Sequence, residues 1–369
     1  MPHTPFRINK NAPLTGVICA YNPRNSGMYT VDEAAHRYFS TKNSPFELIV
    51  TQGRDRIGGL RYRMTRYIND LRRYHTIVFW GDFLNNPMWG LDTYPGRRGV
   101  AGQRSTAEEW LTIYLDLKKH LPDTRIVVAG GCALGASKFL SSDEDLRTRY
   151  ANFIQSADAV ILRDPGSLAL IQREVLNPGP HVQLGFDCAS LLKPFAPSQH
   201  RGRYFAHCFH RSLRPKEAQE VVRFVEELTG LRGIHINWLK NQWPRPTFHW
   251  RLNGQRALLR HAQFCISDIY HLSICSMNEG TPALCMSKAE KEIDSTLNES
   301  KKKLLFKMID LERHHIEWTE ATWRDELQSR LQRIPEANQD PASWSMGFTH
   351  AQQRLRTQLD HLFTPARAP

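Results

Sequence analysis

The stretch CISDIYHLSICSMNEGTPALCM, residues 265–286, decides the fold. It begins with an apolar run typical of a buried strand, which ends at the polar residues Asp268, Tyr270 and His271. A short run of small and apolar residues then indicates a helix, and an Asn-Glu-Gly turn separates this helix from a second apolar strand. This order of strand, helix and strand places the acid, the phenol and the imidazole at the carboxyl end of the first strand.

The same alternation of strand and helix runs through the first half of the chain. Helical periodicity is clearest over residues 106–120 and 61–74, each with an apolar stripe on one face. Parallel sheets covered by helices have this alternation, so we expect an α/β fold. The predicted strands are 16–20, 46–50, 76–80, 125–129, 159–162 and 181–186.

Two prolines and a polar run interrupt this pattern at residues 192–202, which we interpret as a linker. Beyond it the alternation resumes with a strand, a helix and a further strand over residues 204–238. We therefore expect two Rossmann-like domains, at residues 1–195 and 196–300. A helical tail at residues 301–369 is predicted to pack back across the domains.

Composition narrows the classes of protein. The chain has 369 residues, 41% of them hydrophobic, and a formal net charge of +12. This charge favours anionic partners such as phosphorylated small molecules or an anionic membrane surface, whereas the lack of a recognised nucleic-acid-binding motif argues against nucleic acid. No apolar run reaches the roughly 18 residues that span a bilayer, and no signal-like segment is present. We therefore expect a cytoplasmic protein, able to visit the inner face of a membrane.

The seven cysteines form no Cys-x-x-Cys pair and lie in apolar contexts. Buried, reduced thiols explain such cysteines better than a metal or redox site does. The sequence therefore predicts no metal site.

Residues just past each strand are the candidates for a functional site, because open α/β sheets bind ligands at the carboxyl ends of their strands. After the first strand, Asn25 and Gly27 open a helix whose backbone N–H groups can face an anion, although ordinary turns use the same residues. After the third strand, Asp82 can reach a sugar hydroxyl or simply cap its loop.

Two further groups lie in the second predicted domain. His207, His210 and Arg211 suit a phosphate or carboxylate, although a histidine on a strand is more often structural. In the opening stretch, His271 can act as a general acid or base that Asp268 orients; alternatively, Asp268 caps the helix and His271 packs. The other predicted substrate contacts of this stretch are Tyr270, Glu279 and Gly280.

Several strings resemble the polysaccharide pyruvyl transferase family. The segments SADAVILRDPGSL, residues 156–168, and GFDCASL, residues 185–191, are similar to two segments of that family. The opening stretch is similar to its Asp-Arg-x-His-Gly signature, and the turn after the first strand resembles its N-terminal glycine-rich turn. The matching positions are Asn25, Gly27, Asp268, His271, Gly280 and Pro282. Together these strings span roughly residues 15–290 in the family's order.

The resemblance implies two Rossmann-like domains of GT-B type with a helical C-terminal tail. It also implies transfer of a pyruvyl group from phosphoenolpyruvate to hydroxyls of a sugar or lipid-linked glycan, as in exopolysaccharide synthesis. Phosphoenolpyruvate would be an anionic donor substrate, and no cofactor is implied. By the same resemblance, His271 is the acid or base, Asp268 its orienting partner, and Arg163 a structural or anion-binding arginine.

The chain departs from the family at two places. Ile269 stands where the family has an arginine, which removes a bidentate clamp for an anion. Trp80-Gly81-Asp82 replaces a glycine pair of the family. Two other hypotheses therefore remain: a GT-B glycosyltransferase that uses a nucleotide-sugar, and a non-catalytic relative that binds a glycan or an anion.

Overall fold

The computed structural model describes residues 13–19, 22, 25–42, 44–50, 56–65, 68–81, 83–84, 115–175, 177–195, 200–239, 241, 243–288 and 300–364. The strands that precede the linker are β1 Thr15–Cys19, β2 Phe46–Val50, β3 Arg56–Ile57, β4 Leu60–Met64, β5 Thr76–Trp80, β6 Arg125–Gly131, β7 Ala159–Leu162 and β8 Val182–Leu184. Those that follow it are β9 Tyr204–Cys208, β10 Arg232–His235, β11 Cys265–Ser267, β12 Ala283–Lys288 and β13 His315–Trp318.

The helices cover and connect these strands. The α-helices are α1 Ser26–Ser40, α3 Leu117–His120, α4 Ser137–Leu140, α5 Glu144–Ser156, α6 Pro165–Glu174, α7 Pro215–Thr229, α8 Phe248–His261, α9 Tyr270–Asn278, α10 Ser300–Met308, α11 Trp323–Leu331, α12 Ile334–Gln339 and α13 Pro341–Phe363. The 3-10 helices are η1 Ile68–Arg73, η3 Leu134–Ala136, η4 Cys188–Leu191, η5 Arg245–Thr247 and η6 Glu312–His314.

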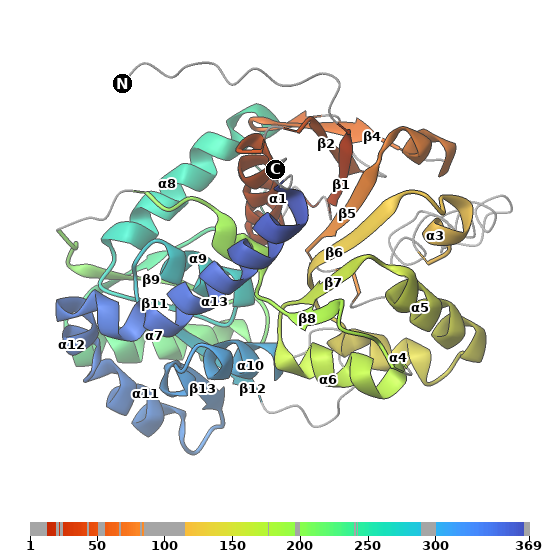
Figure 1. Ribbon diagram of the computed structural model, residues 1–369. Helices are drawn as coiled ribbons and strands as arrows, with labels where there is room; N and C mark the ends of the chain where they lie inside the picture. The colour runs from red at the N-terminus through yellow and green to blue at the C-terminus, as the bar shows by residue number, and fades with distance from the viewer. Residues whose placement is uncertain are drawn as a thin grey trace, which may run out of the picture.

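Two sheets form two lobes that lie side by side (Figure 1). The first sheet has the strand order β3-β4-β2-β1-β5-β6-β7-β8, and the second has the order β10-β9-β11-β12-β13. The β3–β4 pair is antiparallel, and the other strand pairs of the described residues are parallel. The predicted α/β class with two Rossmann-like sheets is therefore confirmed.

Continuous apolar sequence explains why the central strands form where they do. Every residue of β1 and of β5 is buried, as is expected for parallel strands that have helices on both faces. The order of the strands reverses at β1, which lies between β2 and β5, and again at β9, which lies between β10 and β11. Such reversals open a crevice at the carboxyl ends of the strands, and this crevice is where α/β proteins bind ligands.

One predicted helix is wrong. Within this range, residues 61–64 belong to β4 and residues 68–73 form η1. Leu60 and Tyr62 are buried, while Arg61 and Arg63 are exposed. This alternation has the period of a strand. Of the helix predicted at 106–120, the structure describes only residues 115–120, which include α3.

The expected domain boundary at residue 300 also needs correction. Residues 315–318 form β13, which pairs in parallel with β12 and completes the second sheet. The segment after residue 300 is therefore part of the second sheet as well as a source of helices.

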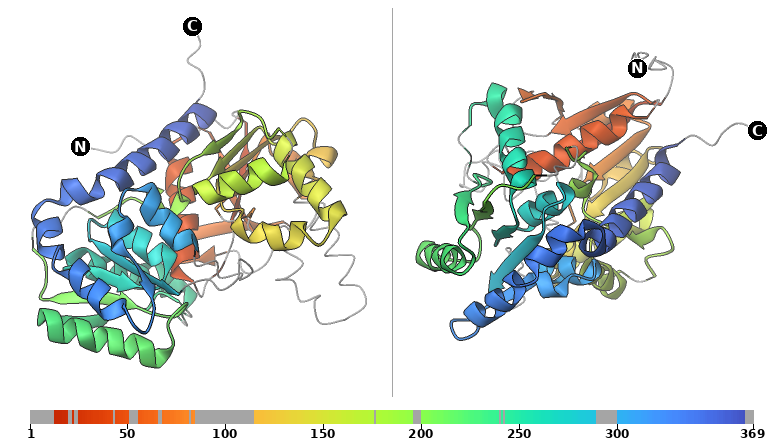
Figure 2. Two further views of the ribbon diagram at one scale, coloured as in Figure 1. Left: turned by 90° about the horizontal axis from the view of Figure 1, so that it is seen from below. Right: turned by 90° about the vertical axis from the view of Figure 1, so that its left-hand side faces the viewer.

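The helix α13 runs from the second lobe back to the first (Figures 1 and 2). There the Tyr38 hydroxyl donates a hydrogen bond to the Asp360 carboxylate at 2.9 Å, and the Arg125 guanidinium donates to the Leu362 carbonyl at 2.7 Å. One hydrophobic cluster contains Val17 of the first sheet, Ala206 of the second and further side chains of α13. The two lobes therefore share a core.

Buried Asp32 of α1 makes the stability of this core dependent on pH. Its side chain is 1% exposed and accepts a hydrogen bond from the Tyr62 hydroxyl at 3.0 Å. Burial raises the pKa of Asp32 to about 7, although the hydrogen bond from Tyr62 acts in the opposite direction.

We expect Asp32→Asn to stabilise the protein increasingly as pH rises from about 4 to about 7. Below pH 4 the aspartate is protonated in both the folded and the unfolded state. As pH rises, the unfolded state ionises first, so the wild type loses stability, by roughly 3–4 kcal/mol at pH 8. Denaturant unfolding at pH 4 and pH 8 measures the effect, with Glu320→Gln at an exposed position as control. Equal effects of Asp32→Asn at both pH values would contradict the assignment.

Candidate functional site

The residues that follow β11 meet the first domain at a buried carboxylate. His271 lies in the first turn of α9, and its Nε2 is 3.4 Å from Oδ2 of Asp187. Asp187 follows β8, and the same Oδ2 accepts a hydrogen bond at 3.4 Å from the Arg163 guanidinium, which follows β7. The other oxygen of Asp187 accepts a hydrogen bond at 2.8 Å from the backbone N–H of Ala189. One carboxylate thus joins two strand ends of the first domain to a helix start of the second.

Electrostatics keep Asp187 ionised. Its burial alone would raise the pKa, but the charge and hydrogen bond of His271, the charge of Arg163 and the N–H of Ala189 together lower it to about 2. The His271 side chain is 14% exposed, so the imidazole is partly accessible to solvent. A histidine that is paired with an ionised carboxylate and partly accessible to solvent can hold or transfer a proton.

Gly27 explains how α1 approaches this histidine. A Cβ added to Gly27 would lie 2.6 Å from Cβ and 2.8 Å from Nδ1 of His271, which is too close for any side chain. The start of α1 is fixed by Asn25, whose side chain accepts the backbone N–H of Gly27 at 3.0 Å. Glycine is therefore required here by close packing, and the N-terminus of α1 lies directly beside the imidazole.

Residues of the second domain also hydrogen-bond to the start of α1. The Ser26 N–H donates to the Trp238 carbonyl at 3.0 Å, and the Asn241 side chain donates to the Ser26 hydroxyl at 2.5 Å. Asn25 also forms an isolated antiparallel bridge with Leu239. The predicted residues Asn25 and Gly27 are thus brought to His271, whereas the predicted Asp82 lies outside the described residues.

Tyr270 stacks beside the same cluster. The Arg163 guanidinium lies over its ring at 4.8 Å, and the Lys301 ammonium lies at 5.9 Å from the ring centre. Arg163 is 1% exposed, and its Nε is 3.7 Å from the carboxylate of Asp164. Of the two roles that the sequence allowed for Arg163, the structure favours the structural one. Lys301 of α10 brings a further cation to the edge of the cluster.

Asp268 does not orient His271 as predicted. Its two carboxylate oxygens accept four backbone N–H groups at 2.6–3.0 Å. The four donors are the backbone N–H groups of His210, Arg211, Ser212 and Leu213. Asp268 therefore fixes the loop after β9, and the carboxylate that faces His271 is that of Asp187.

Glu279 and Gly280, which the sequence predicted as substrate contacts, have structural contacts at the end of α9. The buried carboxylate of Glu279 pairs with Arg256 at 2.5 Å and accepts the backbone N–H of Phe195 at 3.0 Å. Gly280 has a φ of +77°, and its carbonyl accepts a hydrogen bond from Arg201 at 2.7 Å. These residues attach the end of α9 to the linker between the domains.

The other predicted group lies at the end of β9. His207 packs with its ring 6.1 Å from Phe209, and burial, with the nearby His235, lowers the pKa of His207 to about 4. His210 and Arg211 are exposed. His207 is therefore largely a packed side chain, whereas its two exposed neighbours can meet a ligand.

Ile269, which stands where the family has an arginine, is a buried core residue. Its side chain is 4% exposed and belongs to the core that both domains share. Its backbone N–H donates to the Ser267 hydroxyl at 2.9 Å. This position therefore supplies no positive charge at the end of β11.

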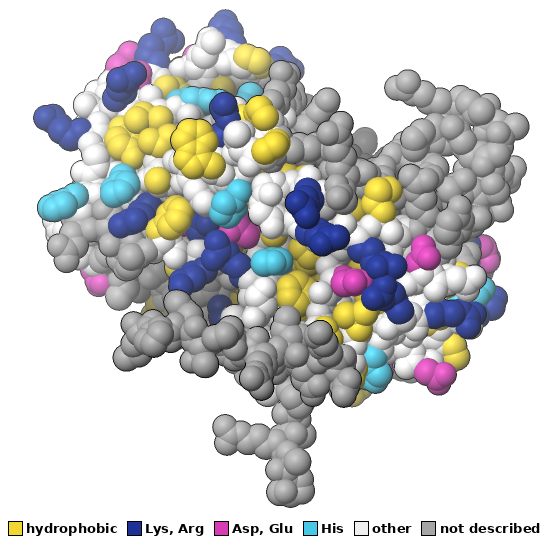
Figure 3. Space-filling model, turned by 90° about the horizontal axis from the view of Figure 1, so that it is seen from above, with side chains coloured by type: hydrophobic (Ala, Val, Ile, Leu, Met, Phe, Trp, Pro, Cys, Tyr) yellow, Lys and Arg dark blue, Asp and Glu magenta, His cyan; other side chains and the backbone are white. Residues whose placement is uncertain are grey.

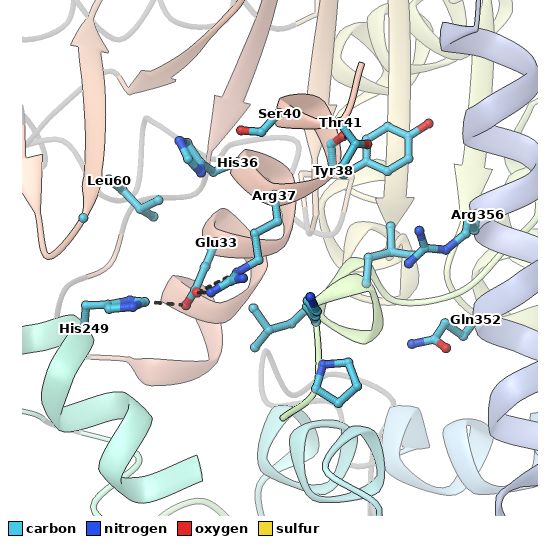
Figure 4. Close-up of a pocket in the computed structure, with 15 residues that line it drawn as sticks. Glu33, His36, Arg37, Tyr38, Ser40, Thr41, Leu60, His249, Gln352 and Arg356 are labelled. Carbon is cyan, nitrogen blue, oxygen red and sulfur yellow. Dashed lines mark hydrogen bonds and ion pairs between the residues drawn. The ribbon is translucent and has the colours of Figure 1, made fainter. Parts of the chain in front are cut away.

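A separate cavity of about 640 Å³ lies farther along α1 (Figure 4). Its wall includes the buried Glu33, which pairs with Arg37 at 2.7 Å and lies 3.7 Å from His249 of α8. Leu192 of the linker and Arg356 of α13 also line it. Since α1 runs back from the carboxyl end of β1, this cavity lies away from the strand ends that form the His271 cluster.

On the face seen from above, the positive side chains of the described residues do not gather into one patch (Figure 3). Figure 3 shows Lys and Arg side chains interspersed there with acidic, histidine and hydrophobic side chains. Among the described residues, no helix has both the length and the apolar character needed to cross a bilayer.

Comparison with known proteins gives the family of the chain. The profile of the polysaccharide pyruvyl transferase family matches residues 60–288, which include Arg163, Asp187 and His271. The chain belongs to this family. No curated protein matches the sequence.

Solved structures show the fold. A "ugt transferase" from Siraitia grosvenorii in complex with UDP is 10% identical, with a TM-score of 0.52 over 95% of this chain and 98% of that chain. A UDP-N-acetylglucosamine 2-epimerase is 9% identical, with a TM-score of 0.51 over 97% of each chain. At these identities the likeness concerns the fold alone, and that fold is GT-B.

Sequence reasoning missed the role of Asp187. The residue lies in GFDCASL, directly after the predicted strand 181–186, so its position past a strand end was a usable signal. What the sequence does not show is that β8 ends opposite α9, because this contact depends on how the two domains pack.

We expect Gly27→Ala to impair the site more than the fold. The added methyl group must displace His271, and a shift of about 1 Å at a reacting group can cost roughly 100-fold in rate. Gly254→Ala in α8 is the matched control, because a Cβ there meets nothing within 4 Å. Steady-state turnover, with thermal unfolding to verify folding, measures the effect. Unchanged turnover of Gly27→Ala would show that the packing against His271 is irrelevant to activity.

Proposed function

We propose that the protein transfers a pyruvyl group from phosphoenolpyruvate to two hydroxyls of a sugar or lipid-linked glycan. The observation that carries the proposal is the pairing of His271, at the start of α9 and beside the N-terminus of α1, with Asp187. Both His271 and Asp187 lie within residues 60–288, which match the family. The helix α1 follows β1, where the strand order of the first sheet reverses, and α9 follows β11, the neighbour of β9, where the order of the second sheet reverses. Such reversals are where α/β folds bind ligands.

The reaction needs a proton donor beside an anionic enol. A proton is added to the methylene carbon of phosphoenolpyruvate, and a sugar hydroxyl attacks the carbon that bears the phosphate and loses its own proton. A second hydroxyl then displaces phosphate and closes a cyclic ketal, so one phosphate leaves for each ketal formed. We assign the first proton to His271, whose Nε2 faces Asp187 and whose Nδ1 side faces the start of α1.

The donor carries a carboxylate and a phosphate, which need positive partners. The dipole of α1 supplies one such environment at its N-terminus, although the N–H groups of Ser26 and Gly27 already pair within the protein. We assign further contacts to Arg211, which is exposed after β9, and to Lys301, which lies beside Tyr270. These cations would take the part of the arginine that Ile269 replaces.

The protein is expected to release phosphate from phosphoenolpyruvate only when an acceptor is present. Phosphorus NMR with a panel of sugars and lipid-linked glycans follows this release. In deuterium oxide the methyl group of the ketal should carry one deuterium, because the added proton comes from an exchangeable group. Absence of acceptor-dependent release across the panel would contradict the proposal. Saturable stabilisation by a nucleoside diphosphate, with none by phosphoenolpyruvate, would favour a glycosyltransferase.

His271→Asn should lower turnover by about 10²–10⁴-fold, the range of general acid–base catalysis, with little change in affinity for phosphoenolpyruvate. Asp187→Asn tests the positioning role: we expect turnover to fall by roughly 10²-fold and the pH dependence of kcat to shift. His36→Ala, on the wall of the separate cavity, is the control and should retain turnover. Wild-type turnover of His271→Asn would overturn the role given to His271, whereas binding of phosphoenolpyruvate without any turnover by the wild type would favour the non-catalytic alternative.

A further inference from the structure

Three metal-ligating side chains converge at the carboxyl edge of the second sheet. The Cys208 thiol ends β9, His210 follows it, and His235 ends the neighbouring strand β10. One ligand atom from each of these three residues lies within 4.8 Å of the other two. We propose that this cluster binds a divalent transition-metal ion of the zinc class.

The sheet itself creates the convergence. The strands β9 and β10 are parallel and in register, with His235 opposite His207. The residues at their carboxyl ends therefore emerge at the same edge, although 235 and 210 are far apart in sequence. The rings of His210 and His235 are 5.9 Å apart and nearly perpendicular, at 86°. Cysteine spacing alone could not reveal this group, because two of the three ligands are histidines.

The donor set has the chemistry of a borderline-soft metal. One thiolate and two imidazoles suit Zn²⁺ or Co²⁺, whereas Mg²⁺ and Ca²⁺ prefer oxygen ligands. Three protein ligands leave the fourth tetrahedral position for water or an exogenous anion. Cys208 is buried, while both histidines are exposed, so an ion can enter from the solvent side and rest on the sulfur.

Closure of the site needs only small movements. Ligand atoms around a tetrahedral zinc ion lie about 3.3–3.6 Å apart, given metal–nitrogen and metal–sulfur distances of about 2.0–2.3 Å. The observed spread of up to 4.8 Å requires shifts of about 1 Å, which exposed imidazoles can make by side-chain rotation. The backbone at His210 is already held, because its N–H donates to Asp268 at 2.9 Å.

The test uses the full-length protein without a polyhistidine tag, stripped with a chelator and titrated with Co²⁺ alone. We expect a thiolate-to-cobalt charge-transfer band and visible bands of tetrahedral intensity, which saturate at one ion per chain and disappear on addition of Zn²⁺. Histidine-only binding, with visible bands but no charge-transfer band, would overturn the proposal. Failure to retain any ion after gel filtration would overturn it equally.

Variants assign the ligands. Cys208→Ser should abolish the charge-transfer band. His210→Ala and His235→Ala should each weaken Co²⁺ binding by more than the about 10–100-fold that loss of an outer-shell partner costs. His207→Ala and Cys275→Ser are the matched controls, and each should leave the band intact. Should Cys208→Ser fail to fold, the two exposed histidine variants still decide: wild-type affinity in both would refute the site.

Discussion

The pairing of Asp187 with Arg163 and His271 is the interaction on which the arrangement of the two domains depends. Asp187 is buried and contacts both Arg163 and His271, and a buried carboxylate is costly to leave without partners, so this contact opposes any motion that carries His271 away from the first domain. The contact of Gly27 with the same imidazole adds a steric limit, since no side chain can lie between them. Electrostatics and packing thus define one position for the imidazole.

Around this centre, three acids that look alike in the sequence perform different tasks. Asp187 faces His271, Asp268 fixes a loop through four backbone N–H groups, and Glu279 holds Arg256 at the linker. All three are buried, and each is compensated by donors of a different kind. Ile269, next to Asp268, is buried and stands where the family has an arginine, so this strand end lacks that cation. The loop that Asp268 holds is unaffected.

The sequence pattern predicted the strands and the position of His271 just past a strand end, because apolar runs and their ends can be read from neighbouring residues. The partner of His271 was mispredicted because Asp268 is close in sequence, whereas Asp187 approaches only through the packing of two domains. The helix expected at 61–74 failed because arginines at alternate positions can satisfy either periodicity, and burial of Tyr62 against Asp32 selects the strand. The convergence of His210 and His235 on Cys208 was not predicted, because it depends on β9 and β10 being neighbours, and a single sequence does not reveal strand order.

The return of α13 to the first domain has a consequence for synthesis. The ribosome makes Asp360 only after the entire second domain, yet Tyr38 and Lys42 of the first domain bind this residue. Domains generally fold in the order in which they are synthesised. Here part of the surface of the first domain is covered only when α13, which follows the second domain in the sequence, has been made. Until then the aromatic side chains that α13 covers, Phe39 among them, are exposed to solvent and to other chains. A nascent chain of this protein is therefore a natural client for chaperones that shield apolar surface.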